Sequence, residues 1–353
     1  MENYADKFVL EDINKIIEDE FIINKLFNKT IMITGATGLI GTLLIKVLLE
    51  YNKLREANIK ILALVRNLEK AKIIYEANKN LEFIVQDITE PFIIEETIDY
   101  IIHGASLTAS KDFVCKPVET IDTAINGTKN ILELARTKKV KSMVYLSSLE
   151  VYGIRKEKHC TIHESDYGLI DFLSVRSSYS ESKRMVECMC ISYLVEYDVP
   201  VKIARLAQTF GPGVSYDDGR VFAEFSRCAL ERRNIVLHTD GSTIRNYCYI
   251  SDAVSALLYI LLKGNVGEAY NVANKKTSIS IKNMAELVAD KIANNTIKVE
   301  ICNDNNIEKF GYNPTTVACL DVTKLEKLGW SAKVDLEEMF INTINSMKLK
   351  KEV

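Results

Sequence analysis

The sequence predicts an α/β protein in which a doubly wound parallel sheet carries a smaller C-terminal lobe. Short apolar strands alternate with amphipathic helices from residue 30 onward, which is typical of parallel sheets with right-handed crossovers and helices on both faces. The first strand also runs into a glycine-punctuated turn and then directly into a helix. With 353 residues, of which 47% are hydrophobic, the chain can form such a sheet and an appended lobe.

The expected elements follow in order along the chain. Residues 8–27 alternate apolar and acidic positions, which indicates one or two amphipathic helices beside the main domain. Five strands are then expected at 30–34, 59–65, 81–85, 100–103 and 142–146, with helices at 39–51, 118–137 and 179–197. After a sixth strand at 201–205 the alternation loosens. Helices are expected there at 221–232, 251–262 and 280–293, with a strand at 235–238.

The glycine-punctuated turn points to a dinucleotide site. Gly35, Gly38 and Gly41 are spaced three apart between the first strand and its helix. One lets the chain turn, one lets backbone approach a phosphate, and one lets helix and strand pack closely. The helix N-terminus then offers free N–H groups and a positive dipole end to a pyrophosphate. Three glycines alone could form a tight structural turn, but here the strand before and the helix after complete the required context.

The pattern of strands and helices divides the chain into three parts. Residues 1–28 are an N-terminal helical extension, and residues 29–205 are a Rossmann-like NAD(P)-binding domain. Residues 206–353 are expected to form mainly a substrate-binding lobe, with some segments returning to the Rossmann-like domain.

Composition narrows the class of protein. A net charge of −3 indicates no surface for a polyanion, so no nucleic acid partner is expected. No apolar run approaches the roughly 18 residues that a membrane span needs, and the polar N-terminus is unlike a secretion signal. Eight scattered cysteines without a CxxC pair, and four histidines, predict neither a metal site nor a disulfide framework. A cytoplasmic protein with reduced cysteines is expected.

Two further stretches carry groups suited to proton transfer. Tyr179 and Lys183 lie four apart on an expected helix, where an ammonium beside a phenol would lower the pKa of the phenol. Alternatively, Tyr179 is a packing residue and Lys183 a solvated charge. Ser147 and Ser148 follow the fifth strand, at the edge where a doubly wound sheet places its ligand crevice. Alternatively, a serine there caps the next turn.

Together these signals resemble the extended short-chain dehydrogenase/reductase family, which includes nucleotide-sugar epimerases, dehydratases, decarboxylases and reductases. Its TGxxGxxG loop matches 34–41, its SSxxVYG segment matches 147–153, and its YxxxK motif matches 179–183. Two later segments resemble its turn with arginine before Gly-Pro, at 205–212, and its GxxxRxxxxVxD segment, at 241–252. The five matches occur in family order and extend over about residues 29–345.

The resemblance implies roles for individual residues. Ser148 would polarise the reacting carbonyl or hydroxyl, Tyr179 would exchange its proton, and Lys183 would bind the nicotinamide ribose while tuning the tyrosine. Glu150 matches a glutamate of the dehydratases and decarboxylases that acts as a base or orients the sugar, unless it is only a structural carboxylate. Substrate contacts are expected from Ser147, Gln208 and Arg245. Cofactor contacts are expected from Gly35, Thr37, Gly38, Leu39, Ile40, Gly41, Arg66, Asp87, Ile88, Ala105, Ser106, Tyr179 and Lys183.

Within that set, Arg245 would pair with a substrate phosphate, for which the guanidinium fork is well suited. Gln208 stands where the family usually has asparagine for the same task, so its longer amide puts that contact in doubt. Asp87 and Ile88 stand where the family packs the adenine, and the backbone at Ala105 and Ser106 would pass the cofactor.

The end of the second strand bears on the choice of cofactor. NAD enzymes use an acid there for the ribose hydroxyls, whereas this chain has Val65-Arg66-Asn67. An arginine favours a 2′-phosphate, so NADP(H) is preferred, with NAD(H) possible. Alternatively, Arg66 lies over the adenine ring without selecting.

The cofactor and residue 149 suggest the reaction. Users of NADPH more often perform net reduction, and Leu149 stands where the dehydratases have an acid. The leading hypothesis is NADPH-dependent reduction of a keto-sugar nucleotide, to a sugar or alditol nucleotide, for surface polysaccharides. The alternatives are 4-epimerisation, decarboxylation and 4,6-dehydration. A non-catalytic NADP(H)-binding regulatory protein is the hypothesis from another class. The resemblance also implies a homodimer formed through helices 118–137 and 179–197.

Overall fold

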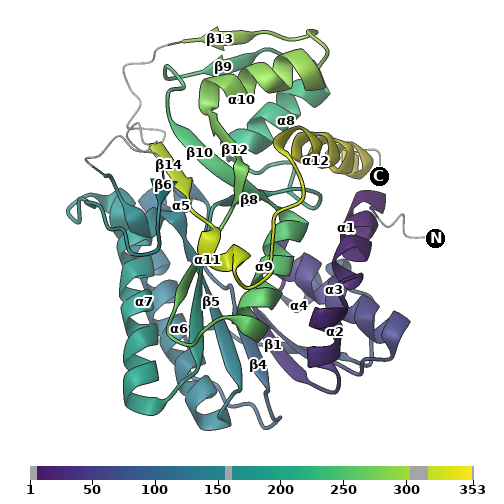
Figure 1. Cartoon of the computed structure of the whole chain (residues 1–353), viewed down its shortest axis with the longest axis vertical. Helices are drawn as coiled ribbons and strands as arrows, with labels where there is room; N and C mark the ends of the chain where they lie inside the picture. Colours follow the sequence, from purple (N-terminus) through teal and green to yellow (C-terminus); the bar gives the residue numbers. More distant parts are fainter. Residues whose placement is uncertain (1–5, 156–160, 303–316, 352–353) are drawn as a thin grey trace.

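The fold is built on a seven-stranded parallel sheet (Figure 1). The structure is a computed structural model that describes residues 6–155, 161–302 and 317–351. The strands lie in the order β11-β7-β5-β4-β1-β2-β3, and every neighbouring pair is parallel. Their bounds are β1 Thr30–Thr34, β2 Lys60–Val65, β3 Leu81–Val85, β4 Tyr100–His103, β5 Ser142–Ser148, β7 Val201–Leu206 and β11 Ala269–Val272. The predicted doubly wound fold class is confirmed, with the strand order reversing between β1 and β4.

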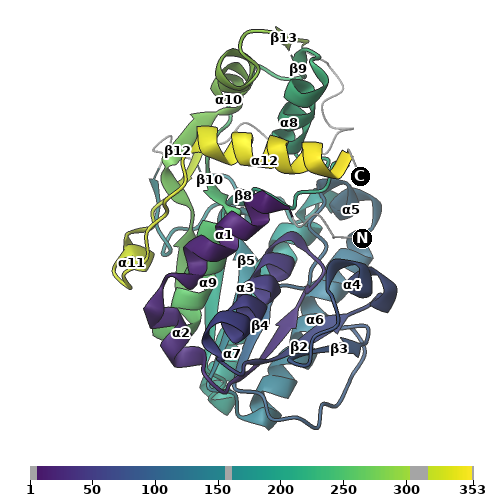
Figure 2. The same ribbon diagram turned by 90° about the vertical axis from the view of Figure 1, so that its right-hand side faces the viewer.

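Helices cover both faces of this sheet (Figure 2). Along β1, Ile31 and Ile33 point into one hydrophobic core and Met32 into the other. This explains why the strands are almost continuously apolar, since neither face meets water. The first core includes side chains of α3 (Leu39–Arg55) and α9 (Ile250–Lys263), and the second those of α6 (Pro117–Lys138) and α7 (Ser178–Tyr197).

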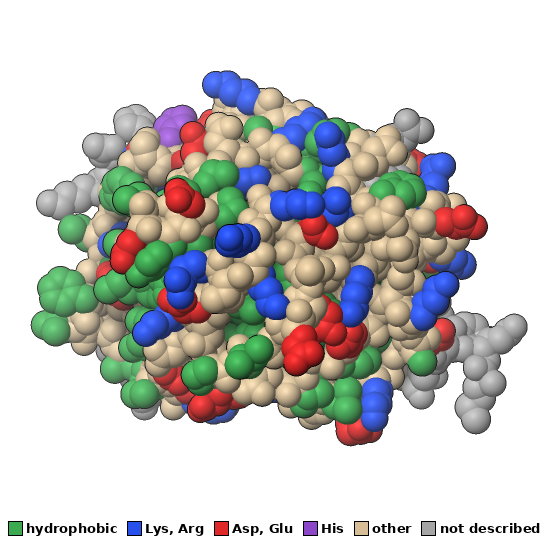
Figure 3. Space-filling view, turned by 90° about the horizontal axis from the view of Figure 1, so that it is seen from below, with side chains coloured by type: hydrophobic (Ala, Val, Ile, Leu, Met, Phe, Trp, Pro, Cys, Tyr) green, Lys and Arg blue, Asp and Glu red, His purple; other side chains and the backbone are tan. Residues whose placement is uncertain are grey.

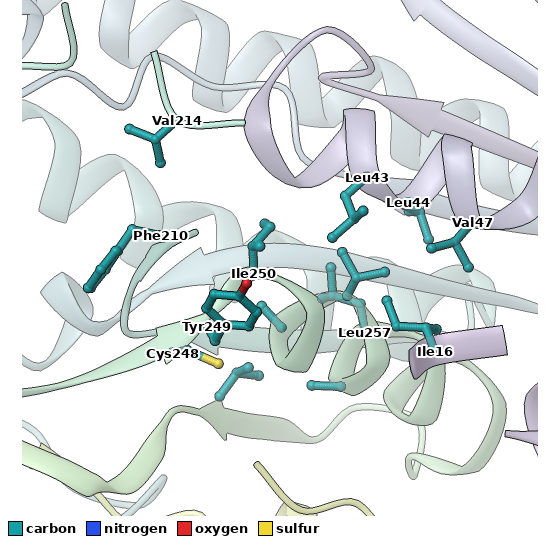
Figure 4. Close-up of a cluster of buried hydrophobic side chains, with 14 of the residues drawn as sticks. Ile16, Leu43, Leu44, Val47, Phe210, Val214, Cys248, Tyr249, Ile250 and Leu257 are labelled. Atoms are coloured by element: carbon teal, nitrogen blue, oxygen red, sulfur yellow. The ribbon is translucent and has the colours of Figure 1, made fainter. Parts of the chain in front are cut away.

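The N-terminal residues form two helices, α1 (Lys7–Ile17) and α2 (Glu20–Leu26), within the predicted range 8–27. Ile16 of α1 packs into the same cluster as Leu43 of α3 and Leu257 of α9 (Figure 4). The Tyr51 hydroxyl of α3 donates to the Ile16 carbonyl at 3.0 Å. The extension is therefore part of the core on that face.

A second, smaller sheet lies beyond the carboxyl ends of the main strands (Figure 1). Its strands are β12 Asn274–Ser280, β10 Ile244–Tyr249, β14 Val317–Leu320 and β6 Thr161–Ile162, with β8 Gln208–Phe210 also paired to β10. A two-stranded sheet joins β9 Ile235–Leu237 and β13 Val299–Ile301. The helices of this part are α8 Val221–Glu231, α10 Ile281–Leu287 and α12 Leu336–Lys351. Shorter helices are α4 Leu68–Ile74, α5 Ser110–Cys115 and α11 Thr323–Glu326.

Three sequence predictions differ in detail from the structure. The fifth strand continues to Ser148, because Ser147 and Ser148 pair with residues 205 and 206 of β7. The helix predicted over 280–293 is α10 followed by a π-helical turn at Val288–Ile292. Most strands of the second sheet were not predicted from the sequence, because they are short and come from distant parts of the chain.

The surface carries charges of both signs. On the face that is shown in Figure 3, basic and acidic side chains are interspersed. Among the described residues, no helix is both long and apolar enough to cross a membrane. Within the same residues, no three His, Cys, Asp or Glu side chains gather in a way that could hold a metal ion. Cys160 of the sequence lies outside the described ranges.

A buried carboxylate ties α1 to α9, and its burial predicts that stability depends on pH. Asp12 is 1% exposed, and its Oδ1 accepts a hydrogen bond from Ser251 Oγ at 3.2 Å. Burial raises the pKa of Asp12 from 3.8 to about 7. Between these values the folded state holds more protons than the unfolded state. The free energy of unfolding therefore falls as pH rises through this window, by up to about 1.4 kcal/mol per pH unit for one group.

Asp12→Asn removes this titration, so we expect the variant to lose less stability than the wild type between pH 5 and 7.5. Urea unfolding at both pH values measures the difference. Glu11→Gln, at an exposed neighbouring position of α1, is the matched control and should follow the wild type. Equal losses in wild type and Asp12→Asn would contradict the assignment.

Candidate active site

The loops after β1 and β4 meet where the strand order reverses. Gly35 has φ +70°, and a Cβ there would lie 2.8 Å from the Gly104 carbonyl carbon and oxygen. A Cβ on Gly41 would lie 2.3 Å from the Gly35 oxygen. At Gly38, which precedes α3, no side chain caps the helix, so the N–H groups of its first turn remain available to a ligand. This backbone cradle fits the pyrophosphate of a dinucleotide.

A buried pair of hydrogen bonds holds these two loops together. Thr34 Oγ1 accepts from the backbone N–H of Gly104 at 3.1 Å and of Ala105 at 3.0 Å. The same hydroxyl lies 2.6 Å from His103 Nδ1, and His103 Nε2 lies 2.9 Å from Thr128 Oγ1. Because the Thr34 oxygen already accepts two bonds, its proton goes to His103 Nδ1, which makes His103 a neutral Nε2–H tautomer. Burial lowers the pKa of His103 to about 3, consistent with this state.

The predicted site residues surround one cavity of about 1020 Å³. It begins at the glycine loop, passes the carboxyl ends of β4 and β5, and reaches β8 and β10 of the second sheet. Its lining includes the predicted residues Gly35, Thr37, Gly38, Leu39, Ile40, Gly41, Arg66, Asp87, Ile88, Ala105, Ser106, Ser147, Ser148, Glu150, Tyr179, Lys183, Gln208 and Arg245. The structure thus brings together residues that are up to 210 positions apart in the sequence, from Gly35 to Arg245.

Tyr179 and Lys183 lie on the first turns of α7 and face the cavity. The Tyr179 ring stacks on the Phe113 ring of α5, with centroids 4.2 Å apart and planes 10° apart. Lys183 Nζ donates to the Leu146 carbonyl at 2.7 Å and lies 5.6 Å from the Tyr179 ring centre. Burial lowers the pKa of Lys183 to about 8.

The predicted lowering of the Tyr179 pKa by Lys183 is not what the structure shows. Burial raises this pKa, as does the charge of Glu150, whereas Ser148 and two arginines act in the opposite direction. The physical reason is the burial of the phenol; Lys183, whose ammonium donates to the Leu146 carbonyl on β5, is not among the main influences on this pKa.

Glu150 is held by two partners, which were not predicted. Its carboxylate accepts two hydrogen bonds from Arg176, at 2.8 and 3.0 Å, and a third from Ser180 Oγ at 3.0 Å. Arg176 also lies 4.8 Å from the ring centre of Phe113, and so belongs to the same stack as Tyr179. Glu150 is therefore an ion-paired carboxylate at the rim of the reacting region.

Ser147 differs from its predicted role in substrate binding. Successive side chains of a strand point to opposite faces, so the hydroxyls of Ser147 and Ser148 point in different directions, although both residues border the cavity. The Ser147 side chain is buried, and its hydroxyl donates to Glu187 Oε1 at 2.5 Å. That hydroxyl is thus bound within the protein, and Ser148 is the one directed to Tyr179.

The far end of the cavity presents polar groups without protein partners. Arg245 Nε and Gln208 Oε1 are buried and accept or donate no hydrogen bond within the described residues. Arg220, which was not predicted, also lines the cavity; it is ion-paired with Asp218 at 2.5 Å and lies 4.8 Å from the ring centre of Phe222. Unpartnered buried polar atoms of this kind are costly unless a ligand satisfies them.

The opposite end of the cavity lies at the carboxyl ends of β2 and β3. Arg66 is exposed there, and the neighbouring Asn67 caps α4 by accepting from the Lys70 N–H at 2.9 Å. Hydrogen bonds from Thr89 lower the pKa of Asp87, and the charge of Arg66 adds to this effect. Arg66 and Asp87 therefore lie close together at this end of the cavity.

Comparison with known proteins agrees with this geometry. The model of the NAD dependent epimerase/dehydratase family matches residues 31–273. UDP-glucuronic acid decarboxylase 3 from Arabidopsis thaliana is 33% identical over 318 residues, covering 88% of this chain and 86% of that protein. The chain belongs to the NAD-dependent epimerase/dehydratase family. The predicted resemblance to extended short-chain dehydrogenases is thus confirmed, as is the prediction of an enzyme of that type.

Solved structures share the fold of this epimerase/dehydratase family member. An epimerase from Methanothermobacter thermautotrophicus superposes with a TM-score of 0.79 at 21% identity, covering 96% of this chain and 97% of that one. UDP-glucuronic acid 4-epimerase from Bacillus cereus, solved in complex with NAD, gives a TM-score of 0.74 at 22% identity, covering 91% and 99%.

Proposed function

We propose that the protein is a nicotinamide-dependent nucleotide-sugar decarboxylase whose substrate is a nucleotide-linked hexuronic acid such as UDP-glucuronic acid. The observation that supports it most directly is the similarity to UDP-glucuronic acid decarboxylases along 88% of the chain. The net reduction that the sequence predicted has no support among these relatives. Decarboxylation was among the alternatives.

The residues at the carboxyl end of β5 suit this chemistry. A bound nicotinamide would accept a hydride from the sugar and later return it. Oxidation of the hydroxyl at C4 makes the uronic acid a β-keto acid, which loses carbon dioxide readily. Water would supply the proton that replaces the carboxylate at C5. Tyr179 would take the hydroxyl proton and give it back, Ser148 would donate a hydrogen bond to the same oxygen, and the Lys183 ammonium would bind the nicotinamide ribose.

The surroundings of Glu150 favour decarboxylation over dehydration. Elimination of water needs an acid beside the departing hydroxyl, and Leu149 cannot donate a proton. The Glu150 carboxylate is already engaged by Arg176 and Ser180. We propose that Glu150 orients the sugar and that no residue at this place protonates a leaving hydroxyl.

The nucleotide part of the substrate is assigned to the second sheet. Arg245 and Gln208 stand on the paired strands β10 and β8. Arg245 Nε is a buried donor that a diphosphate oxygen could satisfy, and Gln208 Oε1 is a buried acceptor that a sugar hydroxyl could satisfy. We propose that Arg245 binds the diphosphate and that Gln208 contacts the substrate next to it.

The test is a panel of nucleotide sugars, incubated with NAD or NADP and followed by mass spectrometry. The proposal expects a product that is lighter by one carbon dioxide, from a nucleotide-linked uronic acid and without net consumption of cofactor. An isomer of unchanged mass would instead indicate 4-epimerisation, the reaction named for the Bacillus cereus neighbour. Net oxidation of NADPH would revive the reductase hypothesis.

The preference for NADP(H) remains a prediction that rests on Arg66. If Arg66 meets a 2′-phosphate, Arg66→Ala should weaken the binding of NADPH by about ten-fold or more and leave that of NADH nearly unchanged. Fluorescence titration with both cofactors measures this. A parallel loss for both, or none, would remove Arg66 from cofactor selection. Lys72→Ala, at an exposed position of α4 that does not line the cavity, is the control.

The predicted homodimer also remains a prediction. On α6 and α7, the predicted pairing helices, Val118 is 77% exposed, Met185 53% and Val195 79%, so each helix has exposed apolar side chains. We expect sedimentation to give twice the chain mass, and Val195→Glu with Met185→Glu to shift it to the monomer. A monomeric wild type at micromolar concentration would contradict the prediction.

A further inference from the structure

A buried carboxylate that the proposed mechanism does not use lies one helical turn below Lys183. Glu187 is four residues further along α7, so the two side chains share a helix face. Glu187 is 9% exposed. Its Oε1 accepts from Ser147 Oγ at 2.5 Å and from Arg205 Nε at 3.0 Å, and its Oε2 accepts from Arg205 Nη2 at 2.7 Å.

Arg205 extends this cluster towards the second sheet. Its Nη1 donates to the Tyr152 hydroxyl at 3.0 Å and to the Glu164 carbonyl at 2.8 Å. The Tyr152 hydroxyl donates to Asn271 Oδ1 at 2.6 Å. Asn271 Nδ2 in turn donates to two carbonyls, of Ile162 in β6 at 3.0 Å and of Asp321, just after β14, at 2.9 Å.

This buried polar network therefore joins β5 and α7, which carry Ser148, Tyr179 and Lys183, to β6 and β14 of the second sheet. Ser147 precedes Ser148 on β5, and Tyr152 follows Glu150 by two residues in the same 3-10 turn. A buried ion pair contributes little net stability compared with well-packed apolar side chains. A role in placing the neighbouring groups is a better physical reason for these charges.

We propose that Glu187 is a positioning residue for the reaction: through Ser147 and Arg205 it fixes the end of β5 beside Ser148, and it supplies the buried negative charge that keeps Lys183 an ammonium. The expected effect of Glu187 on catalysis rests on the proposed function. The expected effect of Glu187 on the protonation of Lys183 does not depend on which substrate the protein uses.

The groups around Lys183 support the electrostatic part. On α7 these are Glu187, Cys190 and Tyr179, and the neighbouring strands contribute Tyr145 and the neutral His103. Burial lowers the pKa of Lys183 to about 8, and the charge of Glu187 is the largest influence in the opposite direction.

Loss of Glu187 would therefore lower the pKa of Lys183 further. If turnover needs the ammonium, activity is lost as pH rises through this pKa. The alkaline limb of the pH profile should then move to lower pH in a variant without Glu187.

The experiment compares the wild type with Glu187→Gln, which removes the buried negative charge while its amide oxygen can still accept from Ser147 and Arg205. Glu187→Leu/Arg205→Met is the second variant, for use if Glu187→Gln does not fold; it removes both charges of the pair, so its effect on Lys183 should be smaller but in the same direction. Glu181→Gln, on the exposed side of α7, is the control. Thermal unfolding and dinucleotide titration establish that each variant is folded and binds cofactor.

Two readouts decide the proposal. In folded Glu187→Gln we expect the alkaline limb of kcat/KM with UDP-glucuronic acid to move by about one pH unit or more to lower pH. We also expect the NMR titration of 13Cε-labelled lysine, with Lys183 assigned through Lys183→Met, to give a lower pKa for Lys183. Superimposable profiles or an unchanged Lys183 titration would overturn the proposal. A wild type without turnover on any sugar would defeat the proposed function alone, since the NMR titration still tests Glu187.

Discussion

Tyr179→Phe is expected to lower turnover by about 10²- to 10⁴-fold, the usual contribution of a positioned acid–base group. The change removes only the hydroxyl. The phenylalanine ring can keep the stacking on Phe113, which lies 4.2 Å away, so the fold and the shape of the cavity should persist. Initial rates with the nucleotide sugar that proves active, measured at saturating cofactor, give the loss.

The matched control is Tyr145→Phe. Tyr145 lies on β5, and its ring centre is 4.7 Å from the Nζ of Lys183. Its hydroxyl is buried, and the residue does not line the cavity. It should retain most activity. Dinucleotide affinity should be nearly unchanged in both variants. If Tyr179→Phe turns over as fast as the wild type, the assignment of Tyr179 is wrong. If the wild type itself is inactive on every sugar nucleotide, the non-catalytic binding protein becomes the better hypothesis.

Gly35→Ala is expected to weaken dinucleotide binding by more than about ten-fold. At φ +70° a non-glycine residue costs about 1–3 kcal/mol, and the new Cβ would lie 2.8 Å from the Gly104 backbone. The loops after β1 and β4 would have to separate, which displaces the cradle offered to the pyrophosphate. Each 1.4 kcal/mol corresponds to a ten-fold change in affinity, so the loss should exceed about ten-fold.

Isothermal titration with NAD and NADP measures this loss, and circular dichroism shows whether the variant is folded. Gly219→Ala is the control, because its Cβ would meet nothing within 4 Å and its φ is not in the left-handed range. It should bind as the wild type does. Undiminished affinity in folded Gly35→Ala would show that the cofactor does not approach this turn.

The fold and the centre of the site were predictable because their signals are local. A glycine at positive φ, a strand covered on both faces, and the i, i+4 spacing of Tyr179 and Lys183 each depend on a few neighbouring residues. The partners that set the chemistry were not predictable in this way. Arg176 meets Glu150 from 26 positions away, and His103 meets Thr34 from 69, through bonds that exist only in the folded chain.

The predictions that differed from the structure also have a common physical origin. Assigning Ser147 to the substrate treated two adjacent serines as equivalent, although a strand that continues to Ser148 turns them to opposite faces. The expected effect of Lys183 on Tyr179 followed from spacing alone and did not include the Leu146 carbonyl. In both cases a neighbouring backbone element decided the outcome.

The seventh strand of the main sheet has a consequence for how the protein can be made. β11 pairs with β7 only after the chain has built β8, α8, β9, β10 and α9, and α9 itself covers the sheet face beside α3. On a ribosome, residues 29–205 would therefore emerge with one sheet edge unpaired and part of one apolar face bare. We expect a fragment that stops at residue 205 to aggregate, so the two halves should be expressed as one polypeptide.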